Sequence, residues 1–200
     1  VRAMGLCRPA RAPPVHRMHR TSQGLATAPA FYLCAMIIVT GAAGFIGSAL
    51  IGELLRAGWQ DIVAVDDHSR ADKAANLEGK ELTARVERDE FFSWLDRNEK
   101  QVQFIFHLGA RTDTTLFDKA VFDELNVRYS QRMWEACVKY GIPLVYASSA
   151  ATYGGGEHGY NDADDTLPYK LHPLNPYGES KNEFDKWALQ QEKKPFFWAG

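Results

Sequence analysis

The residues best suited to chemistry are a tyrosine and a lysine four positions apart, in Tyr177-Gly178-Glu179-Ser180-Lys181. On a helix, residues at i and i+4 lie one above the other on the same face. Tyrosine has an ordinary pKa of about 10, and a nearby ammonium group stabilises the phenolate and lowers that pKa. Such a phenolate can remove a proton from an alcohol while a hydride leaves for a nicotinamide, whose ribose the lysine can also hold.

Ser149 is the third candidate, because it follows the apolar stretch Ile142-Pro143-Leu144-Val145-Tyr146-Ala147. Open α/β sheets bind ligands at the C-terminal ends of their strands, where Ser149 would hydrogen-bond the same alcohol oxygen and orient it. Each residue also has a plain structural interpretation. A Tyr/Lys pair is commonly a solvated helix face, and a strand-end serine is commonly a cap or turn residue. Their occurrence together favours catalysis.

A catalytic set of this kind needs a cofactor site, and Thr40 to Gly47 (TGAAGFIG) have the character of one. This glycine turn follows the apolar run Met36 to Val39 and precedes a helix-like stretch. Glycines let the backbone approach a pyrophosphate, and the free N–H groups of the helix N-terminus receive it. The spacing G-x-x-G-x-x-G is one residue longer than the usual fingerprint, and a tight strand-to-helix turn without a ligand is the alternative.

An acidic strand end supports the nucleotide interpretation. The apolar stretch from Asp61 runs into Asp66 and Asp67 about 20 residues after the glycine turn, where an acid meets the ribose hydroxyls of adenosine. Asp66 alone favours NAD, whereas Arg70 and Lys73 could balance the 2′-phosphate of NADP. The residues themselves leave that choice open.

From Met36 onward, strand-like and helix-like stretches alternate. This pattern predicts an α/β fold with a doubly wound parallel sheet, the Rossmann fold. We expect strands at 36–40, 61–66, 81–86 and 142–147, helices at 45–58, 88–98, 117–140 and 176–191, and loops at 68–79 and 152–175. The stretch 102–110 is expected to be a buried strand that turns into a small-residue loop, where Gly109 and Ala110 leave room for a cofactor. The apolar residues of 117–140, which begin with Phe117, are interpreted as core, and Gly141 ends this helix.

Composition indicates a globular protein. The 200 residues are 46% hydrophobic and 24% charged, which suffices for one well-buried domain. No window approaches the roughly 18 consecutive apolar residues of a membrane span, so we expect no membrane partner. Cys7, Cys34 and Cys137 have neither paired nor metal-like spacing. We therefore expect no disulfide and no metal site, in a reducing, cytoplasmic compartment.

The two ends of the chain differ from the middle. Residues 1–35 carry five arginines and no acid; taking those five from the 23 basic residues leaves 18 against 25 acids, a net charge of −7, which gives no indication of a nucleic-acid partner. Residues 1–35 are a disordered extension, a targeting peptide or non-native upstream sequence, and a strand beginning at Met36 favours the last. We expect the dinucleotide-binding domain at 36–200, incomplete because the apolar run 195–200 resembles a strand cut short.

Four segments together resemble a known family. They are Met36 to Gly47 (MIIVTGAAGFIG), Phe106 to Thr115 (FHLGARTDTT), Tyr146 to Gly154 (YASSAATYG) and Leu174 to Lys181 (LNPYGESK). The combination resembles the extended short-chain dehydrogenases/reductases of the NAD-dependent epimerase/dehydratase type. Several segments resemble the ADP-glycero-manno-heptose 6-epimerase family within them. The resemblance covers about 36–200.

The resemblance implies epimerisation at C6 of an ADP-bound heptose through a transient ketone, for the supply of lipopolysaccharide core sugar. It implies NADP as the cofactor, with NAD as the alternative. The implied catalytic set is Ser149, Tyr177 and Lys181. The implied cofactor contacts are Gly41, Gly44, Phe45, Ile46, Gly47, Asp66, Asp67, Lys73, Arg88, Leu108, Gly109, Ala110, Arg111, Thr112, Asn126, Tyr177 and Lys181. For Arg88, a solvated helix residue is the alternative.

Two other functions remain open. The first is another nucleotide-sugar 4-epimerase or a 4,6-dehydratase, although Ala150-Ala151-Thr152 lacks the acid pair that a dehydratase usually has. The second is a catalytically silent dinucleotide-binding protein, against which the intact catalytic set argues. We also expect a homo-oligomer, and the segment 117–140 and the Tyr177 helix are the surfaces to inspect for a helical interface. The substrate-binding part and a second acid/base residue are expected after Gly200, so the chain alone is expected to be inactive.

Overall fold

The computed structural model describes residues 35–195 and the backbone of residues 198–199. The expectations for residues 1–34, including Cys7 and Cys34, lie outside the described residues. The same holds for most of the apolar run at 195–200.

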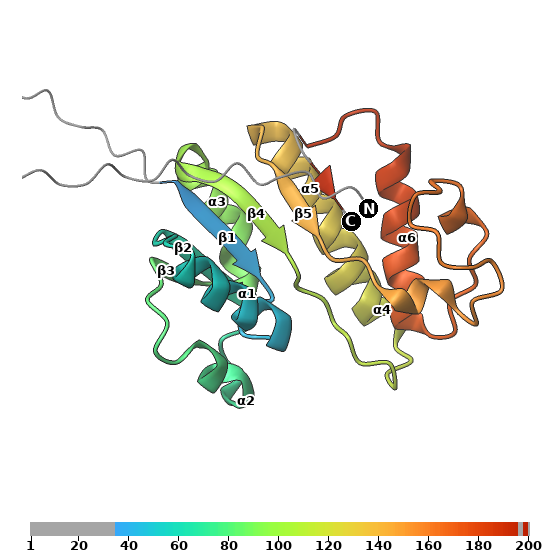
Figure 1. Cartoon of the computed structure of the whole chain (residues 1–200), viewed down its shortest axis with the longest axis horizontal. Helices are drawn as coiled ribbons and strands as arrows, with labels where there is room; N and C mark the ends of the chain where they lie inside the picture. Colours follow the sequence, from blue (N-terminus) through green and yellow to red (C-terminus); the bar gives the residue numbers. More distant parts are fainter. Residues whose placement is uncertain (1–34, 196–197, 200) are drawn as a thin grey trace, which may run out of the picture. The chain divides into compact units, whose positions relative to one another are not determined.

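A parallel sheet of six strands forms the centre of the described chain, in the order β3-β2-β1-β4-β5-β6 (Figure 1). The strands are β1 Met36–Thr40, β2 Ile62–Asp66, β3 Ala84–Glu87, β4 Val102–His107, β5 Leu144–Tyr146 and β6 Trp198–Ala199. Every neighbouring pair is parallel. The order reverses between β1 and β4, which is the switch point where open α/β sheets bind ligands. This confirms the predicted doubly wound sheet.

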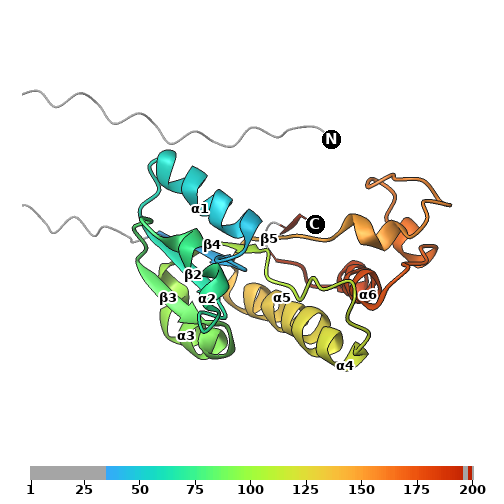
Figure 2. The same ribbon diagram turned by 90° about the horizontal axis from the view of Figure 1, so that it is seen from below.

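Helices cover both faces of this sheet. Figure 2 shows α1 on one side and α3 and α5 on the other. The helices are α1 Phe45–Arg56, α2 Ala71–Ala74, α3 Phe91–Asn98, α4 Lys119–Phe122, α5 Tyr129–Tyr140 and α6 Pro176–Gln190. Single turns are η1 Ala75–Leu77, η2 Arg88–Glu90, η3 Glu99–Gln101, η5 Ala150–Tyr153 and η6 Leu167–Tyr169, and η4 Asp123–Arg128 is a π-helical segment.

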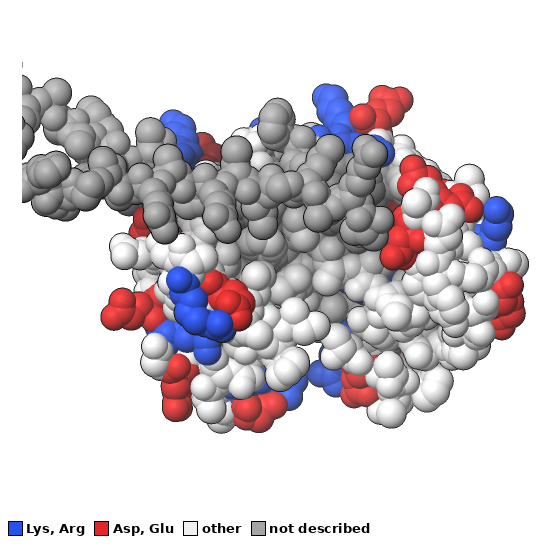
Figure 3. All heavy atoms as spheres, in the orientation of Figure 1, with Lys and Arg blue, Asp and Glu red and all other residues white. Residues whose placement is uncertain are grey.

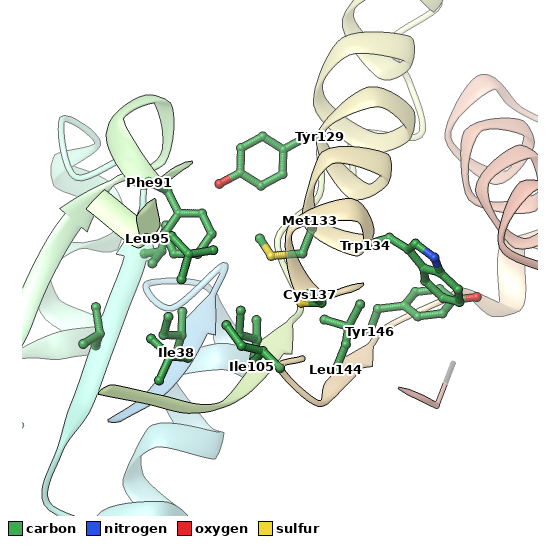
Figure 4. Close-up of a cluster of buried hydrophobic side chains, with 14 of the residues drawn as sticks. Ile38, Phe91, Leu95, Ile105, Tyr129, Met133, Trp134, Cys137, Leu144 and Tyr146 are labelled. Atoms are coloured by element: carbon green, nitrogen blue, oxygen red, sulfur yellow. The ribbon is translucent and has the colours of Figure 1, made fainter. Parts of the chain in front are cut away.

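Strand β1 supplies side chains to two separate cores, because successive residues of a strand point to opposite faces. Ile37 and Val39 pack with Ile51 of α1. Ile38 packs in the other cluster, where α3 and α5 cover the sheet (Figure 4). Figure 4 also shows Met133 of α5 in this cluster. A strand buried on both faces is apolar along its whole length, which explains the unbroken run at Met36 to Val39.

Three sequence expectations need correction. The loop at 68–79 contains α2 and η1, because Leu77 is buried against the α1 side of the sheet and anchors the segment. The strand expected at 81–86 lies at Ala84–Glu87. The helix expected at 117–140 begins at Lys119, because the side chain of Asp118 caps α4, and it contains the π-helical η4. Phe117 lies before this cap and is exposed, so it does not belong to the core.

Gly141 ends α5 with a left-handed φ of 68°, as predicted. Cys137 is buried within α5, and burial raises the pKa of its thiol to about 12. The thiol is therefore protonated and unreactive at neutral pH.

Basic and acidic side chains are interspersed over the described part of the face in Figure 3. None of the helices in the described part is both long and apolar enough to cross a bilayer.

Candidate functional site

The glycine turn needs glycine at two positions because backbone packs against backbone. Gly41 has a φ of 66°, and a Cβ there would lie 2.8 Å from the Cα of Gly109. A Cβ on Gly47 would lie 2.2 Å from the carbonyl oxygen of Gly41. The N-cap residue of α1 is Gly44, which makes no side-chain cap. The N–H groups of the first turn of α1 therefore remain available for an anion.

A cavity of about 470 Å³ lies at the switch point, between this turn, the end of β2 and the loop after β4. All the cofactor contacts expected from the sequence line it, except Asn126, Tyr177 and Lys181. Among the lining residues, Phe45 and Ile46 are largely exposed. Gly109 and Ala110 are the small residues expected under a cofactor, and they line the cavity too. The contact of each residue with a cofactor stays a prediction.

Asp66 joins the end of β2 to the glycine turn. Its Oδ2 accepts a hydrogen bond from Ala43 N at 2.8 Å, and its Oδ1 accepts one from Asp67 N at 2.8 Å. Lys73 Nζ lies 3.6 Å from the same Oδ1. Hydrogen bonds from Ser69 hold the pKa of the Asp67 carboxyl below its ordinary value. Asp66 therefore both lines the cavity and holds the glycine turn against the end of β2.

Three cations line the same end of the cavity: Arg70, Lys73 and Arg88. All three have carboxylate partners: Arg70 pairs with Asp72 at 2.7 Å, Arg88 with Asp89 at 2.9 Å and Lys73 with Asp66 at 3.6 Å. Arg88 is therefore a lining residue at the start of η2 rather than only a solvated helix residue.

Asn126 holds the loop after β4 through hydrogen bonds; it is not among the residues that line the cavity, and its expected contact with the cofactor stays a prediction. It is buried in η4, and its Oδ1 accepts from Arg111 N at 2.7 Å. Its Nδ2 donates to Arg111 O at 3.0 Å and to Ser180 Oγ at 2.9 Å. Ser180 Oγ in turn donates to Tyr177 O at 2.7 Å. Asn126 thus connects the loop that lines the cavity to the first turn of α6.

A buried histidine that the sequence pattern did not single out ends β4. His107 Nδ1 lies 2.7 Å from Thr40 Oγ1, and its Nε2 lies 2.9 Å from Ser130 Oγ. Thr40 Oγ1 also accepts from Gly109 N at 3.1 Å. Burial lowers the pKa of His107 to about 3, so the ring is neutral at physiological pH. The neutral ring links the end of β1 to α5, and a histidine in an otherwise apolar strand is the signal that could have revealed it.

This histidine predicts a specific dependence of stability on pH. Its pKa in the fold is about 3, against about 6.5 when unfolded, so between these values the unfolded chain binds the extra proton. The free energy of unfolding is therefore fully retained above pH ~6.5 and falls as the pH drops toward 3. We expect His107→Gln to remove up to about 1.4 kcal/mol per pH unit of this slope, as measured by urea unfolding at several pH values. His158→Gln, at an exposed position, is the control and should retain the parent slope. An unchanged slope in His107→Gln would contradict the buried neutral histidine.

The three expected catalytic residues lie on two elements that touch. Ser149 is the N-cap of η5, where its Oγ accepts from Ala151 N at 3.2 Å. Tyr177 lies in the first turn of α6, and Lys181 lies one turn later. A Cβ on Gly178 would lie 2.6 Å from Ala151 O, so α6 packs directly on η5 through this glycine. The sequence therefore placed Tyr177 and Lys181 correctly on one helix, whereas Ser149 lies after the end of β5 and caps a turn that was not predicted.

The three side chains make no direct hydrogen bond with one another in the described part of the chain. Neither Ser149 Oγ nor Lys181 Nζ is hydrogen-bonded to the Tyr177 hydroxyl within the described part of the chain. Ser149 lines a second cavity of about 520 Å³, bounded by α6 and the segment 161–171. Lys181 is 4% exposed, and burial lowers its pKa to about 8. A buried ammonium group whose pKa lies this close to neutral pH is suited to stabilising a nearby phenolate or exchanging a proton with it.

The chain is similar to a known family and to curated proteins over most of its length. The NAD dependent epimerase/dehydratase family matches residues 37–196. The ADP-L-glycero-D-manno-heptose-6-epimerase of Fusobacterium nucleatum is 42% identical over 170 residues, which are 82% of this chain and 51% of that protein. The chain spans about half the length of the curated relatives it matches.

Two solved structures share the fold. The ADP-L-glycero-D-manno-heptose-6-epimerase of Helicobacter pylori is similar with a TM-score of 0.64 and 27% identity, over 78% of this chain and 51% of that one. The UDP-glucose 4-epimerase of Thermus thermophilus, in complex with NAD, is similar with a TM-score of 0.59 and 29% identity, over 76% of this chain and 49% of that one.

Proposed function

Because the chain belongs to the NAD dependent epimerase/dehydratase family, we propose that the protein inverts C6 of an ADP-bound heptose by transient oxidation and re-reduction with bound NADP. The observation that carries this proposal is the packing of Tyr177 and the buried Lys181 on one helix, against the turn that holds Ser149. The similarity to the Fusobacterium nucleatum epimerase supports the choice of sugar.

In the proposed reaction, each residue has one role. The Tyr177 phenolate removes the proton of the C6 hydroxyl, and the Lys181 ammonium stabilises that phenolate. Ser149 donates a hydrogen bond to the C6 oxygen and orients it. A bound nicotinamide cofactor supplies the acceptance and the return of a hydride. Inversion requires the return to the opposite face of the ketone, so the ketone must reorient or a second proton donor must act.

The test uses a hybrid protein, called the full-length form below, in which residues 36–200 of this chain are followed by the second half of the Fusobacterium nucleatum relative. It is incubated with ADP-heptose and, separately, with UDP-sugars, and the product configuration is read by NMR. Inversion at C6 of ADP-heptose supports the proposal. Inversion at C4 of a UDP-sugar would contradict the proposal in favour of a 4-epimerase. No reaction with any sugar, despite retained dinucleotide binding, would contradict it in favour of a catalytically silent dinucleotide-binding protein. The 200-residue chain alone is expected to be inactive, and its homo-oligomeric state and cytoplasmic location stay predictions.

The preference for NADP is carried by the cations beside Asp66. Lys73 lies nearest to that carboxylate, so Lys73→Ala removes a positive charge and leaves the negative charge of Asp66 facing the 2′-phosphate. We expect NADP affinity to fall about tenfold, or about 1.4 kcal/mol, while NAD affinity changes less than about twofold. Titration of each dinucleotide into the 200-residue chain measures this. Lys100→Ala, an exposed lysine in η3, is the control. Equal losses for NAD and NADP would refute the role of Lys73 in selectivity.

A further inference from the structure

A buried carboxylate on α6 makes contacts that the proposed reaction does not use. Asp185 follows Lys181 by four residues and Tyr177 by eight, so the three side chains leave the helix on one side. Its Oδ1 accepts a hydrogen bond from Tyr146 Oη at 2.7 Å, and its Oδ2 accepts one from Ser148 Oγ at 2.5 Å. Asp185 therefore fastens α6 to the end of β5.

The position of this contact matters because Ser148 directly precedes Ser149. The backbone at Ser149 turns into η5, whose Ala151 packs on Gly178 of α6. The β5 end is thus held to α6 at two points, one through the Asp185 carboxylate and one through Gly178. Releasing the first would leave Ser149 free to shift relative to the helix that holds Tyr177.

The charge of Asp185 also bears on Lys181. Burial lowers the pKa of Lys181 to about 8, and the negative charge of Asp185 opposes that change. Burial raises the pKa of the Asp185 carboxyl above its ordinary value, and the two hydroxyl donors and Lys181 oppose that rise. Hydrogen bonds to a carboxylate favour its charged form. The carboxylate therefore compensates a buried ammonium that would otherwise lose its proton.

The other titratable groups that face these two side chains do not supply this compensation. Tyr146 of β5 has a pKa raised by burial, so it is a neutral donor at physiological pH. His107 of β4, which interacts electrostatically with Lys181, is neutral as described above. Among the charged side chains of the described residues, Asp185 is the one that acts on Lys181 from its own helix.

We propose that Asp185 is a positioning residue, which keeps Lys181 charged and holds Ser148, and with it Ser149, against the helix that carries Tyr177. This inference rests on the roles proposed for Tyr177 and Lys181. It assigns no contact between Asp185 and the substrate or the cofactor.

The direct test is a pH titration of Lys181 in the 200-residue chain. It is monitored by NMR of lysine labelled with ¹³C at Cε, and the Lys181 signal is assigned as the one missing from Lys181→Met. Asp185→Asn removes the charge at nearly constant shape. We expect the Lys181 midpoint to fall by about one pH unit in this variant. Glu183→Gln, an exposed carboxylate on the same helix, is the control and should leave the midpoint in place. In the full-length form, Asp185→Asn should lower kcat at least about tenfold at neutral pH with KM nearly unchanged.

An Asp185→Asn midpoint equal to that of Glu183→Gln would overturn the proposal. Should thermal unfolding show that Asp185→Asn does not fold, Ser148→Ala decides instead, because loss of one donor weakens the charged form of Asp185 and shifts Lys181 in the same direction by a smaller amount. An unshifted midpoint in that variant overturns the proposal too. The lysine titration needs no turnover, so failure of the proposed epimerisation would leave its result standing.

Discussion

Tyr177→Phe is expected to reduce epimerisation by about 10³-fold or more while dinucleotide affinity stays within about twofold of the parent. The variant removes the oxygen that takes the proton of the C6 hydroxyl, and general base catalysis contributes about 10² to 10⁴ in rate. The change removes a single hydroxyl and leaves every residue that lines the 470 Å³ cavity in place, so cofactor affinity should be retained. Turnover is measured in the full-length form, and dinucleotide binding is measured by titration in both forms.

This variant should fold normally. No hydrogen bond joins the Tyr177 hydroxyl to another residue of the described chain, and the phenyl ring is kept. Tyr169→Phe is the matched control, because Tyr169 Oη also touches α6, by donating to Lys186 O at 3.3 Å, yet lies outside the proposed catalytic set. Turnover should be unchanged in the control. Retained epimerisation in Tyr177→Phe would remove Tyr177 from its assigned role.

The strands and long helices could be predicted because periodicity and stop signals agree there. The run at Met36 to Val39 is apolar throughout because β1 is buried on both faces, and Gly141 ends α5 through its left-handed backbone. The segment 68–79 was mistaken for a loop because one side chain, Leu77, decides its conformation by entering the core. A single anchoring residue has no periodicity, so no pattern in the sequence reports it.

Part of the lining of the cavity could be predicted from the residues, since strand ends on either side of a switch point must meet, and the rest was implied by the family resemblance. What could not be predicted is which polar residues hold the strand ends and loops around the cavity in place. Asn126 fixes the Arg111 backbone from a π-helical segment, and a π turn has no residue signature that separates it from an α-helix. His107 and Asp185 have buried polar partners far away in the sequence, at separations that local spacing cannot reveal.

Gly47→Ala is expected to abolish measurable dinucleotide binding, with a loss of at least about 100-fold, and to lower the free energy of unfolding by about 3 kcal/mol. The new Cβ would lie 2.2 Å from Gly41 O and 2.9 Å from Gly41 C, which are backbone atoms that no side-chain rotation can move. The start of α1 must therefore move away from the turn. That movement also displaces Ala43 N, the donor to Asp66, so the acidic strand end and the anion site separate together.

Gly52→Ala, five residues later on the same helix, separates this steric effect from the general effect of replacing a helical glycine. A Cβ at Gly52 has its nearest neighbours at 3.9 Å, which is ordinary contact with two side chains. Alanine favours a helix interior over glycine, so Gly52→Ala should raise the free energy of unfolding by about 0.5 to 1 kcal/mol and leave dinucleotide affinity unchanged. Urea unfolding and dinucleotide titration of both variants measure the contrast. If Gly47→Ala bound the dinucleotide like Gly52→Ala, the turn would be a structural connection only, and the phosphate site would have to lie elsewhere on the sheet edge.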